Sequence, residues 1–207
     1  LVRPDRAMGY EACMNSETNG TGNYRDGNFG AGCGATVGKF AGMDYCMKSG
    51  IGSCAFQIGG LQVGAVVAVN ALGDIYDWKT GRKIAGLLAE DKRSFRSTEE
   101  LMYANTEIIE NKFTGNTTLG VVITNGKFNK SSLCKIAGMA HDGYARSIRP
   151  VHTSADGDSI YAVSVGDIPA DQDLTGTLAA EAVSEAVIRA VESAVSAYGY
   201  PGLGKLS

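Results

Sequence analysis

The sequence predicts an α+β protein in which helices cover a mixed or antiparallel β-sheet. Three observations predict this class. A Gly-Gly turn joins two strand-like runs near residue 60, a β-branched run at 121–123 suits a further strand, and two long amphipathic segments follow it. An amphipathic helix must bury its apolar stripe, so helices that follow strands pack most readily on the sheet that those strands form.

The first strand pair is expected at residues 53–58 and 61–70, with Gly59 and Gly60 as the hairpin turn. Asn70 closes the second run with a polar amide. A buried Asn must find hydrogen-bond partners, which makes Asn70 a candidate site residue. The plainer reading, which the pattern alone favours, is that Asn70 starts a turn.

The next strand, at residues 119–124, begins directly after a tight turn and a hydroxyl residue. Its β-branched run predicts a strand buried on both faces. Gly115 and Asn116 tolerate the backbone angles of a turn, and Thr117 stands at the mouth of the strand. A cut before Thr117 would leave a free amine beside a hydroxyl, so that one residue would carry both base and nucleophile.

Helices are expected before, between and after these strands. Pro4 suits a first helical turn, Ser131 or Ser132 can cap a later helix, and Pro150 stops that helix. Gly199 is the expected stop signal of the last helix. The expected ranges are about 4–16, 98–109, 131–149 and 177–197.

The composition indicates a soluble globular chain with one sizeable core. Of 207 residues, 44% are hydrophobic and 20% are charged, and the net charge of -3 provides no surface for nucleic acid or an anionic membrane. No apolar run approaches the roughly 18 residues of a membrane span. The most charged segment, residues 77–112, is expected to form a surface loop and a mobile linker ahead of Thr117.

Cysteine and histidine usage points away from a metal centre. The five cysteines form no CxxC pair, and only two histidines are present. Small buried thiols in a reducing cytoplasm are therefore expected, with no metal and no cofactor. His141, beside Asp142, is expected to be a solvated or structurally paired histidine rather than a catalytic one.

Two further stretches resemble ligand-binding motifs. The Gly-rich stretch 30–39 resembles a phosphate loop, but Cys33 replaces its first glycine and Phe40 stands where the loop needs Ser or Thr. We therefore expect a closely packed backbone there, with Lys39 on a solvated rim. Asp156 and Asp158 flank one glycine before a strand at 159–165; they lack the rest of a calcium loop but could hold an amine or a lysine.

Taken together, these weak signals suggest one chemistry. A hydroxyl nucleophile needs a base, a donor for the developing oxyanion, and groups that orient the base. Thr117 could supply the hydroxyl and the amine, while Asn70 could supply the donor. Lys39 and the two carboxylates, Asp156 and Asp158, could keep the amine near neutral and in place.

The chain resembles the DmpA-type peptidase family, which includes β-aminopeptidases and nylon-oligomer hydrolases. The resemblance covers nearly the whole chain and rests on residues 3–5, 8–10, 34–39, 63–70, 116–122, 140–143, 145–153 and 156–158. It implies a four-layer αββα sandwich of the type shared with ornithine acetyltransferase. Family members have a long portion before the Arg-Pro-Asp segment, so an N-terminal part of the sandwich is expected to be missing here.

The resemblance also implies self-processing of the Asn116–Thr117 bond within a single domain, 1–207. Residues 1–116 would then be the C-terminal part of a larger subunit, and residues 117–207 a smaller subunit. Thr117 would attack the amide bonds of a small peptide, an amino-acid amide or an oligomer through an acyl-enzyme. The processed heterodimers are expected to form a homo-oligomer, a tetramer by resemblance, in the cytoplasm.

Site residues follow from the same resemblance. Lys39 and Asn70 match the active-site lysine and asparagine of the nylon hydrolases, and Asp156 and Asp158 match their two acidic positions. The aminopeptidase branch typically carries a Ser nucleophile with a Ser/Glu pair, so Thr117 with two aspartates favours the nylon-hydrolase branch. The alternatives are an acyltransferase of the ornithine acetyltransferase type, against which the Asp-Gly-Asp and Ala-His-Asp-Gly motifs argue, and a non-catalytic structural member.

Overall fold

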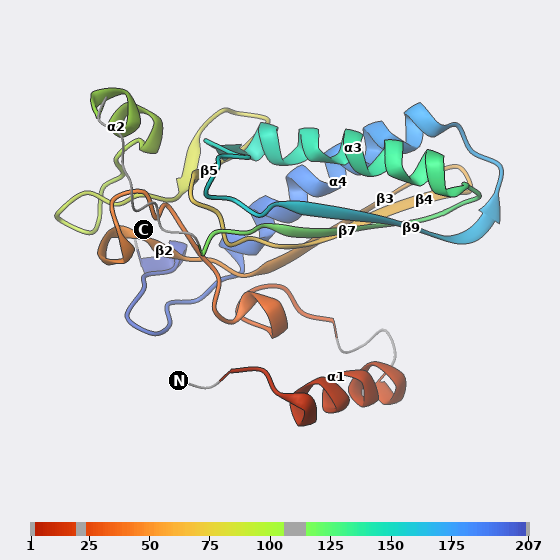
Figure 1. Ribbon diagram of the computed structural model, residues 1–207, viewed down its shortest axis with the longest axis horizontal. Coiled ribbons are helices and arrows are strands. Elements are labelled where there is room, and N and C mark those ends of the chain that lie inside the picture. Colours follow the sequence, from red (N-terminus) through yellow and green to blue (C-terminus); the bar gives the residue numbers. More distant parts are fainter. Residues whose placement is uncertain (1–2, 20–23, 106–114, 206–207) are drawn as a thin grey trace.

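A four-stranded β-sheet with two long helices on one face forms the body of the molecule (Figure 1). This computed structural model describes residues 3–19, 24–105 and 115–205. Strands β3 (Ile51–Ile58), β4 (Leu61–Ala68), β7 (Leu119–Gly126) and β9 (Ser159–Ile168) lie in that order. β3, β4 and β7 pair antiparallel, and β7 pairs parallel with β9, so the expected α+β class and mixed sheet are confirmed.

The hairpin between β3 and β4 is the one that the sequence predicts. Ile58 pairs with Leu61 across the two-residue turn, and Gly59 has a φ of 58°, in the left-handed region that glycine enters without steric cost. The hairpin places Asn70 two residues beyond the end of β4.

The core lies between the sheet and helices α3 (Lys130–Ser147) and α4 (Gln172–Glu192). Val63 and Val67 of β4 are fully buried against α4, whose inward side is rich in alanine and valine. Glycines allow close approach: a Cβ on Gly52 of β3 would lie 2.1 Å from the carbonyl oxygen of Ala186, and one on Gly143 of α3 would lie 2.5 Å from that of Ala180. Small side chains therefore set the spacing between the layers.

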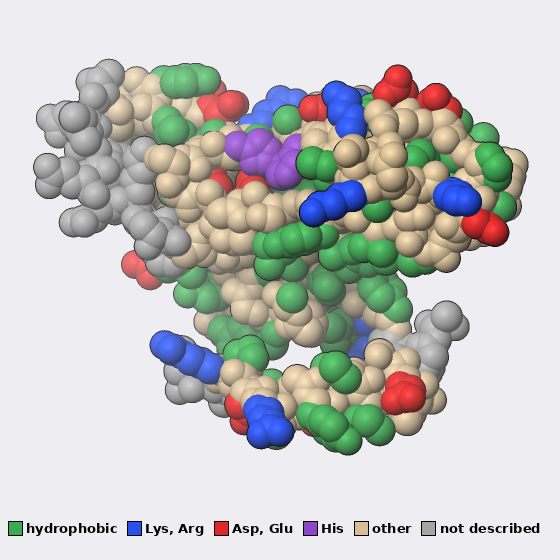
Figure 2. All heavy atoms as spheres, turned by 45° about the vertical axis from the view of Figure 1, so that its right-hand side comes forward, with side chains coloured by type: hydrophobic (Ala, Val, Ile, Leu, Met, Phe, Trp, Pro, Cys, Tyr) green, Lys and Arg blue, Asp and Glu red, His purple; other side chains and the backbone are tan. Residues whose placement is uncertain are grey.

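The other face of the sheet is uncovered by the described residues. Its exposed apolar side chains are Leu119, Val121, Ile123, Tyr161, Val163 and Val165. Figure 2 shows hydrophobic side chains gathered on this side of the body. The expectation that the strand at 119–124 is buried on both faces is therefore wrong for the described residues, in which exposed and buried side chains alternate along β7. One helix layer and one main sheet layer are present, and the remaining layers of the αββα sandwich stay a prediction.

The remaining elements are short. Helix α1 (Arg6–Asn19) lies beyond the uncovered face in Figure 1. Two small sheets, β1-β2 and β6-β5-β8, lie near the end of the main sheet where β4 finishes. Their strands and the other short helices are β1 (Thr36–Val37), β2 (Met47–Lys48), β5 (Asp74–Tyr76), β6 (Lys83–Ala85), β8 (Ile148–Arg149), α2 (Thr98–Ala104), η2 (Gly30–Gly32), η3 (Met43–Tyr45) and η4 (Leu203–Lys205).

The predicted helices exist, but several of their ends are displaced. The last helix begins at Gln172 because the Asp171 side chain caps it by accepting from Leu174 N at 2.8 Å, and it ends at Glu192, before Gly199. Asn129, rather than Ser131 or Ser132, caps α3. Part of the helix expected at 98–109 and of the expected mobile linker lies outside the described residues.

Cysteine burial is mixed. Cys46 and Cys54 are buried, whereas Cys13, Cys33 and Cys134 are exposed, so the expectation of buried thiols is wrong for three of the five. Across the described ranges, no helix combines the length and the apolar character that a membrane crossing requires.

Candidate active site

The candidate residues meet at one end of the strands of the main sheet because of its topology. Ala68 at the end of β4 pairs with Leu119 at the start of β7, which in turn pairs with Ser159 at the start of β9. The residues just outside these three strand ends, Asn70, Thr117 and Asp158, are therefore neighbours. Lys39 joins them from the segment after β1, where its backbone N donates to Leu72 O at 3.0 Å.

Lys39 is a buried lysine bound to Asn70. Its Nζ donates to Asn70 Oδ1 at 2.8 Å and to the main-chain oxygen of Asn70 at 3.1 Å. Only 1% of Lys39 is exposed, so the expected place on a solvated rim is wrong. Burial lowers the pKa of Lys39 to about 8, with the charges of Cys46 and Asp156 acting in the opposite direction.

The closely packed backbone expected around residues 30–39 is confirmed at Gly38. This residue has a φ of 73°, and a Cβ there would lie 2.0 Å from Leu87 N. The tight packing of this segment helps to hold Lys39 inside the protein.

Asn70 connects three parts of the site, so the reading of it as a simple turn residue is wrong. Its Oδ1 accepts from Lys39 Nζ and from Thr36 N, the latter at 3.2 Å. Its Nδ2 donates to Gly115 O at 2.8 Å, and its main-chain oxygen accepts from Thr117 N at 2.9 Å. In the uncut chain, therefore, the Asn70 side-chain amide is hydrogen-bonded to the carbonyl of Gly115, just before the candidate cleavage bond.

The Asn116–Thr117 peptide lies in a polar environment. Thr117 Oγ1 donates to Asn116 O at 2.6 Å, and Gly157 N donates to the same oxygen at 2.9 Å. A Cβ on Gly157 would lie 2.8 Å from Thr117 Oγ1, so the glycine permits this close approach. Two donors thus polarise the carbonyl next to the hydroxyl that the sequence nominates as nucleophile.

The two carboxylates organise the loop around Gly157, and Asp158 also binds the residue that follows Thr117. Asp156 Oδ2 accepts from Thr153 N at 3.0 Å and from Thr153 Oγ1 at 2.6 Å, and its Oδ1 accepts from Leu72 N at 3.4 Å. Asp158 Oδ1 accepts from Thr118 N at 2.8 Å, and its Oδ2 contacts His152 Nδ1 at 2.9 Å. These bonds fix the loop that carries Gly157 beside the Asn116 carbonyl.

Sequence reasoning assigned no role to Gly157, Thr153 or His152. His152 lies in a stretch that carries the family resemblance, but its register with Asp158 depends on the loop between them. The signal that could have found it is chemical: a carboxylate near a buried strand end needs donors, and a nearby histidine can supply one. His141 contacts His152, so the expectation of a structurally paired histidine is confirmed. In the ranges described, no group of three or more His, Cys, Asp or Glu side chains is arranged to hold a metal ion.

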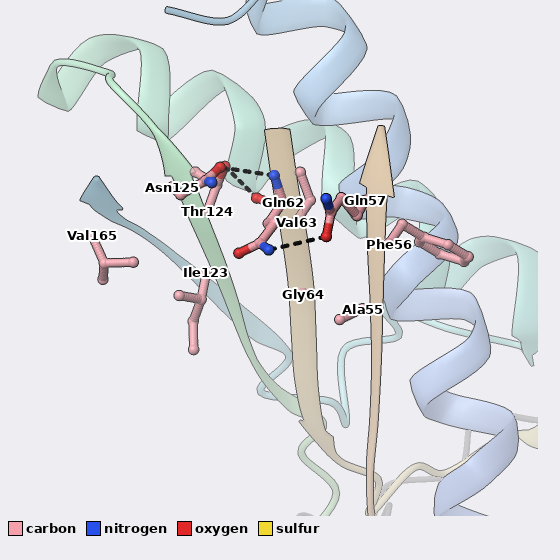
Figure 3. A pocket seen from close by; sticks show the side chains of 10 residues that line it. All are labelled: Ala55, Phe56, Gln57, Gln62, Val63, Gly64, Ile123, Thr124, Asn125 and Val165. Carbon is pink, nitrogen blue, oxygen red and sulfur yellow. Dashed lines mark hydrogen bonds between the residues drawn. The ribbon is translucent and has the colours of Figure 1, made fainter. Parts of the chain in front are cut away.

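A separate hollow of about 450 Å³ lies at the opposite end of the sheet (Figure 3). Its polar groups are satisfied among themselves: Gln62 N donates to Asn125 Oδ1 at 2.7 Å, and Gln62 Nε2 donates to Gln57 Oε1 at 3.1 Å. Thr117 and Asn125 bracket the length of β7, roughly 25 Å at about 3.3 Å per residue. This hollow is not part of the candidate site.

The fold and the residues gathered at these strand ends can be compared with known proteins, and the comparison identifies the family. Residues 3–202 match Peptidase family S58, the DmpA family, and the chain belongs to this family. An uncharacterized aminopeptidase of Mycobacterium leprae is 32% identical over 216 residues, covering 96% of this chain and 59% of the relative. A 6-aminohexanoate-oligomer endohydrolase of Agromyces is 29% identical over 170 residues, covering 81% of this chain and 46% of the relative.

Solved structures support the same fold. An L-aminopeptidase D-Ala-esterase/amidase of Ochrobactrum anthropi, described as a variant of the Ntn-hydrolase fold, has a TM-score of 0.56 at 20% identity, over 84% of this chain and 46% of that chain. A β-aminopeptidase of Burkholderia has a TM-score of 0.55 at 20% identity, over 89% and 52% of the two chains. The chain thus spans about half the length of these proteins. Because aminopeptidase and endohydrolase relatives match at similar identity, the nylon-hydrolase branch stays a prediction.

Proposed function

We propose that the chain belongs to a self-processing amide hydrolase whose nucleophile is Thr117. The observation that carries this proposal is the position of Thr117 Oγ1, 2.6 Å from the carbonyl oxygen of Asn116, to which Gly157 N also donates. The hydroxyl thus lies beside the carbonyl group whose carbon it would attack, and Gly157 N is placed to polarise that carbonyl. The membership of a peptidase family supports the same reaction class.

Self-cleavage would begin with attack of Thr117 Oγ1 on the carbonyl carbon of Asn116. Gly157 N would stabilise the negative oxygen of the tetrahedral intermediate. The C–N bond then breaks, the hydroxyl proton ends on the departing Thr117 nitrogen, and an ester joins Asn116 to Thr117 Oγ1. Water hydrolyses that ester, which leaves a carboxylate on Asn116 and a free amine and hydroxyl on Thr117.

The processed residue would then work on substrates. Its new amine would lie close to Lys39, because Thr117 N and Lys39 Nζ share the main-chain oxygen of Asn70. A nearby ammonium disfavours protonation of the amine, which can then act as the base for its own hydroxyl. Release of Gly115 with the cut end would free Asn70 Nδ2 for the substrate oxyanion. The Asn70 amide would therefore serve the substrate reaction, whereas Gly157 serves the cut.

The substrate class follows from the relatives, which are aminopeptidases and oligomer endohydrolases. We propose a small peptide, an amino-acid amide or an oligomer joined by amide bonds. The uncovered sheet face supports a four-layer sandwich completed by a second sheet, with 1–116 and 117–207 as the processed pieces of one domain. A homo-oligomer of these processed heterodimers is part of the same proposal.

The proposal is tested by the mass and N-terminal sequence of the full-length protein after expression. We expect two pieces, the smaller of which begins with Thr117-Thr118-Leu119. Thr117→Ala should remain a single inactive chain, because it lacks the hydroxyl, whereas Thr117→Ser should still cut. Wild-type cutting in Thr117→Ala would remove the nucleophile assignment. Acetyl transfer from acetylornithine to glutamate would instead favour an acyltransferase.

A further inference from the structure

The two histidines of the sequence lie together beside Asp158. His152 Nδ1 is 2.9 Å from Asp158 Oδ2, and His141 Nδ1 is 3.2 Å from His152 Nε2. The two imidazole rings are 4.9 Å apart between centroids, and Figure 2 shows them as one cluster on the surface. A continuous chain of polar contacts thus runs from the surface of α3 to a carboxylate whose side chain is only 3% exposed.

The carboxylate of Asp158 determines which nitrogen atoms donate in this series of polar contacts. Ionised Asp158 can only accept, so His152 Nδ1 carries a hydrogen. His152 Nε2 then either accepts from His141 Nδ1 when both rings are neutral, or donates to it when His152 is charged. If both rings are charged, two N–H groups face each other and this contact is lost. The hydrogen bond between His141 and His152 is therefore kept when the pair binds one proton and is lost when it binds two.

The backbone of His152 indicates that the arrangement is enforced. Its φ is 56°, in the left-handed region that residues other than glycine, asparagine and aspartate seldom adopt. Such a conformation costs free energy and persists where surrounding contacts hold it. Asp158 and His141 supply those contacts on the two sides of the ring.

At its other end, this series of polar contacts reaches the proposed cleavage site. Asp158 Oδ1 accepts from Thr118 N at 2.8 Å, and Thr118 follows the proposed nucleophile directly. We propose that His152 is a positioning residue, held by His141, which orients Asp158 against the Thr118 amide and limits the pH range in which the site is assembled. This inference rests on the proposed function and adds its regulation by pH.

Burial and the charges of neighbouring residues act on His141. Asp158 and Asp142 favour the charged form of His141, whereas burial, first, and His152, second, lower its pKa. Tyr144 packs edge-on against His141 at 5.5 Å between ring centroids. Burial raises the pKa of Tyr144 far above its usual value, so this ring stays neutral throughout the range in which histidines titrate.

Self-cleavage of the full-length protein as a function of pH tests the proposal. We expect His152→Leu to slow cleavage about tenfold or more, because Asp158 loses its orienting donor. His152→Asn should retain most of the rate, because Asn tolerates the left-handed backbone and keeps an N–H donor. Asp167→Asn, a change of an exposed carboxylate on β9, serves as the control and should leave the rate unchanged.

The pH profile separates positioning from mere stability. Wild-type cleavage should fall on the acid side of its pH profile as a second proton enters the pair, and His141→Gln should lose that step. In folded variants, His152→Leu with the wild-type rate, or His141→Gln with the wild-type acid limb, would overturn the proposal. If His152→Leu does not fold, a folded His152→Asn that cuts as slowly as Asp158→Asn would overturn the proposal instead.

Imidazole nitrogen NMR of Thr117→Ala makes the inference independent of cleavage. Comparison with His152→Asn assigns the signals of His152. We expect hydrogen on Nδ1, donated to Asp158, and a change in this nitrogen signal when Asp158→Asn alters the acceptor. Hydrogen on Nε2 alone, or an Nδ1 signal indifferent to Asp158→Asn, would overturn the positioning role. A wild-type chain that never cuts would overturn the proposed function instead, and the NMR result would still stand.

Discussion

The Lys39 ammonium and the Thr117 backbone nitrogen converge on one acceptor. Lys39 Nζ donates to the main-chain oxygen of Asn70 at 3.1 Å, and Thr117 N donates to the same oxygen at 2.9 Å. The proposed cut would turn the second donor from an amide into an amine without moving it. The shared oxygen thus links a buried charge to the nitrogen whose basicity the chemistry depends on.

Lys39→Met should lower turnover by about a hundredfold, because the ammonium next to the Thr117 amine is lost. Since the pKa of Lys39 is lowered to about 8, the residue carries its proton below that pH and loses it above. Wild-type activity should therefore fall on the alkaline side of this value, and the variant should lack that limb. The pH dependence of kcat/KM for an amide substrate is the measurement. Lys135→Met, on the exposed side of α3, is the control, and a Lys39→Met profile that matches wild type would contradict the assignment.

Asn70→Ala should reduce turnover of the processed enzyme by about a hundredfold or more, the usual cost of losing one oxyanion donor. The loss should appear in kcat with little change in KM, because the donor acts on the transition state. Asn125→Ala at the far end of β7 is the matched control. Unchanged kcat in Asn70→Ala would exclude the amide from the oxyanion role.

Gly157→Ala should slow self-cleavage on the order of a hundredfold, because a displacement of the reacting groups by about 1 Å lowers the rate by about that factor. The added Cβ would lie 2.8 Å from Thr117 Oγ1 and must move either the hydroxyl or the loop. Precursor disappearance on a denaturing gel is the measurement. Gly138→Ala, where a Cβ meets nothing within 4 Å, should cut like wild type. Equal rates for the two variants would rule out a role for the close contact.

Gly52→Ala should destabilise the fold by about 1–3 kcal/mol, the typical cost of overpacking a core. Its Cβ would lie 2.1 Å from Ala186 O, so β3 and α4 would have to separate. Urea unfolding of the full-length protein measures the free energy of unfolding. Gly60→Ala, in the open hairpin turn, should change it by less than about 0.5 kcal/mol. If both variants unfold at the same urea concentration, the spacing of these layers is not limiting.

Local patterns in the sequence predict the elements but not all of their ends. The Gly59-Gly60 hairpin, the strand after Thr117 and the helix at 98 are determined within short windows, because turn chemistry and capping act over a few residues. The start of α4 is set by the Asp171 cap, which precedes the apolar stripe that predicts the helix from residue 177. The exposed alternation of β7 could not be predicted, because a β-branched run reads the same whether or not another layer covers it.

The sequence by itself determined which residues are candidates for the site: Thr117 after a Gly-Asn turn, Lys39 after a glycine stretch, Asn70 at a strand end, and Asp156 with Asp158. Only the tertiary structure decided how they meet. In the fold, Lys39 is buried against Asn70, Gly157 N donates a hydrogen bond to the Asn116 carbonyl, and Asp158 contacts His152. The physical reason is that such contacts arise from strand register and loop packing between residues far apart in the chain, which spacing along the sequence does not encode.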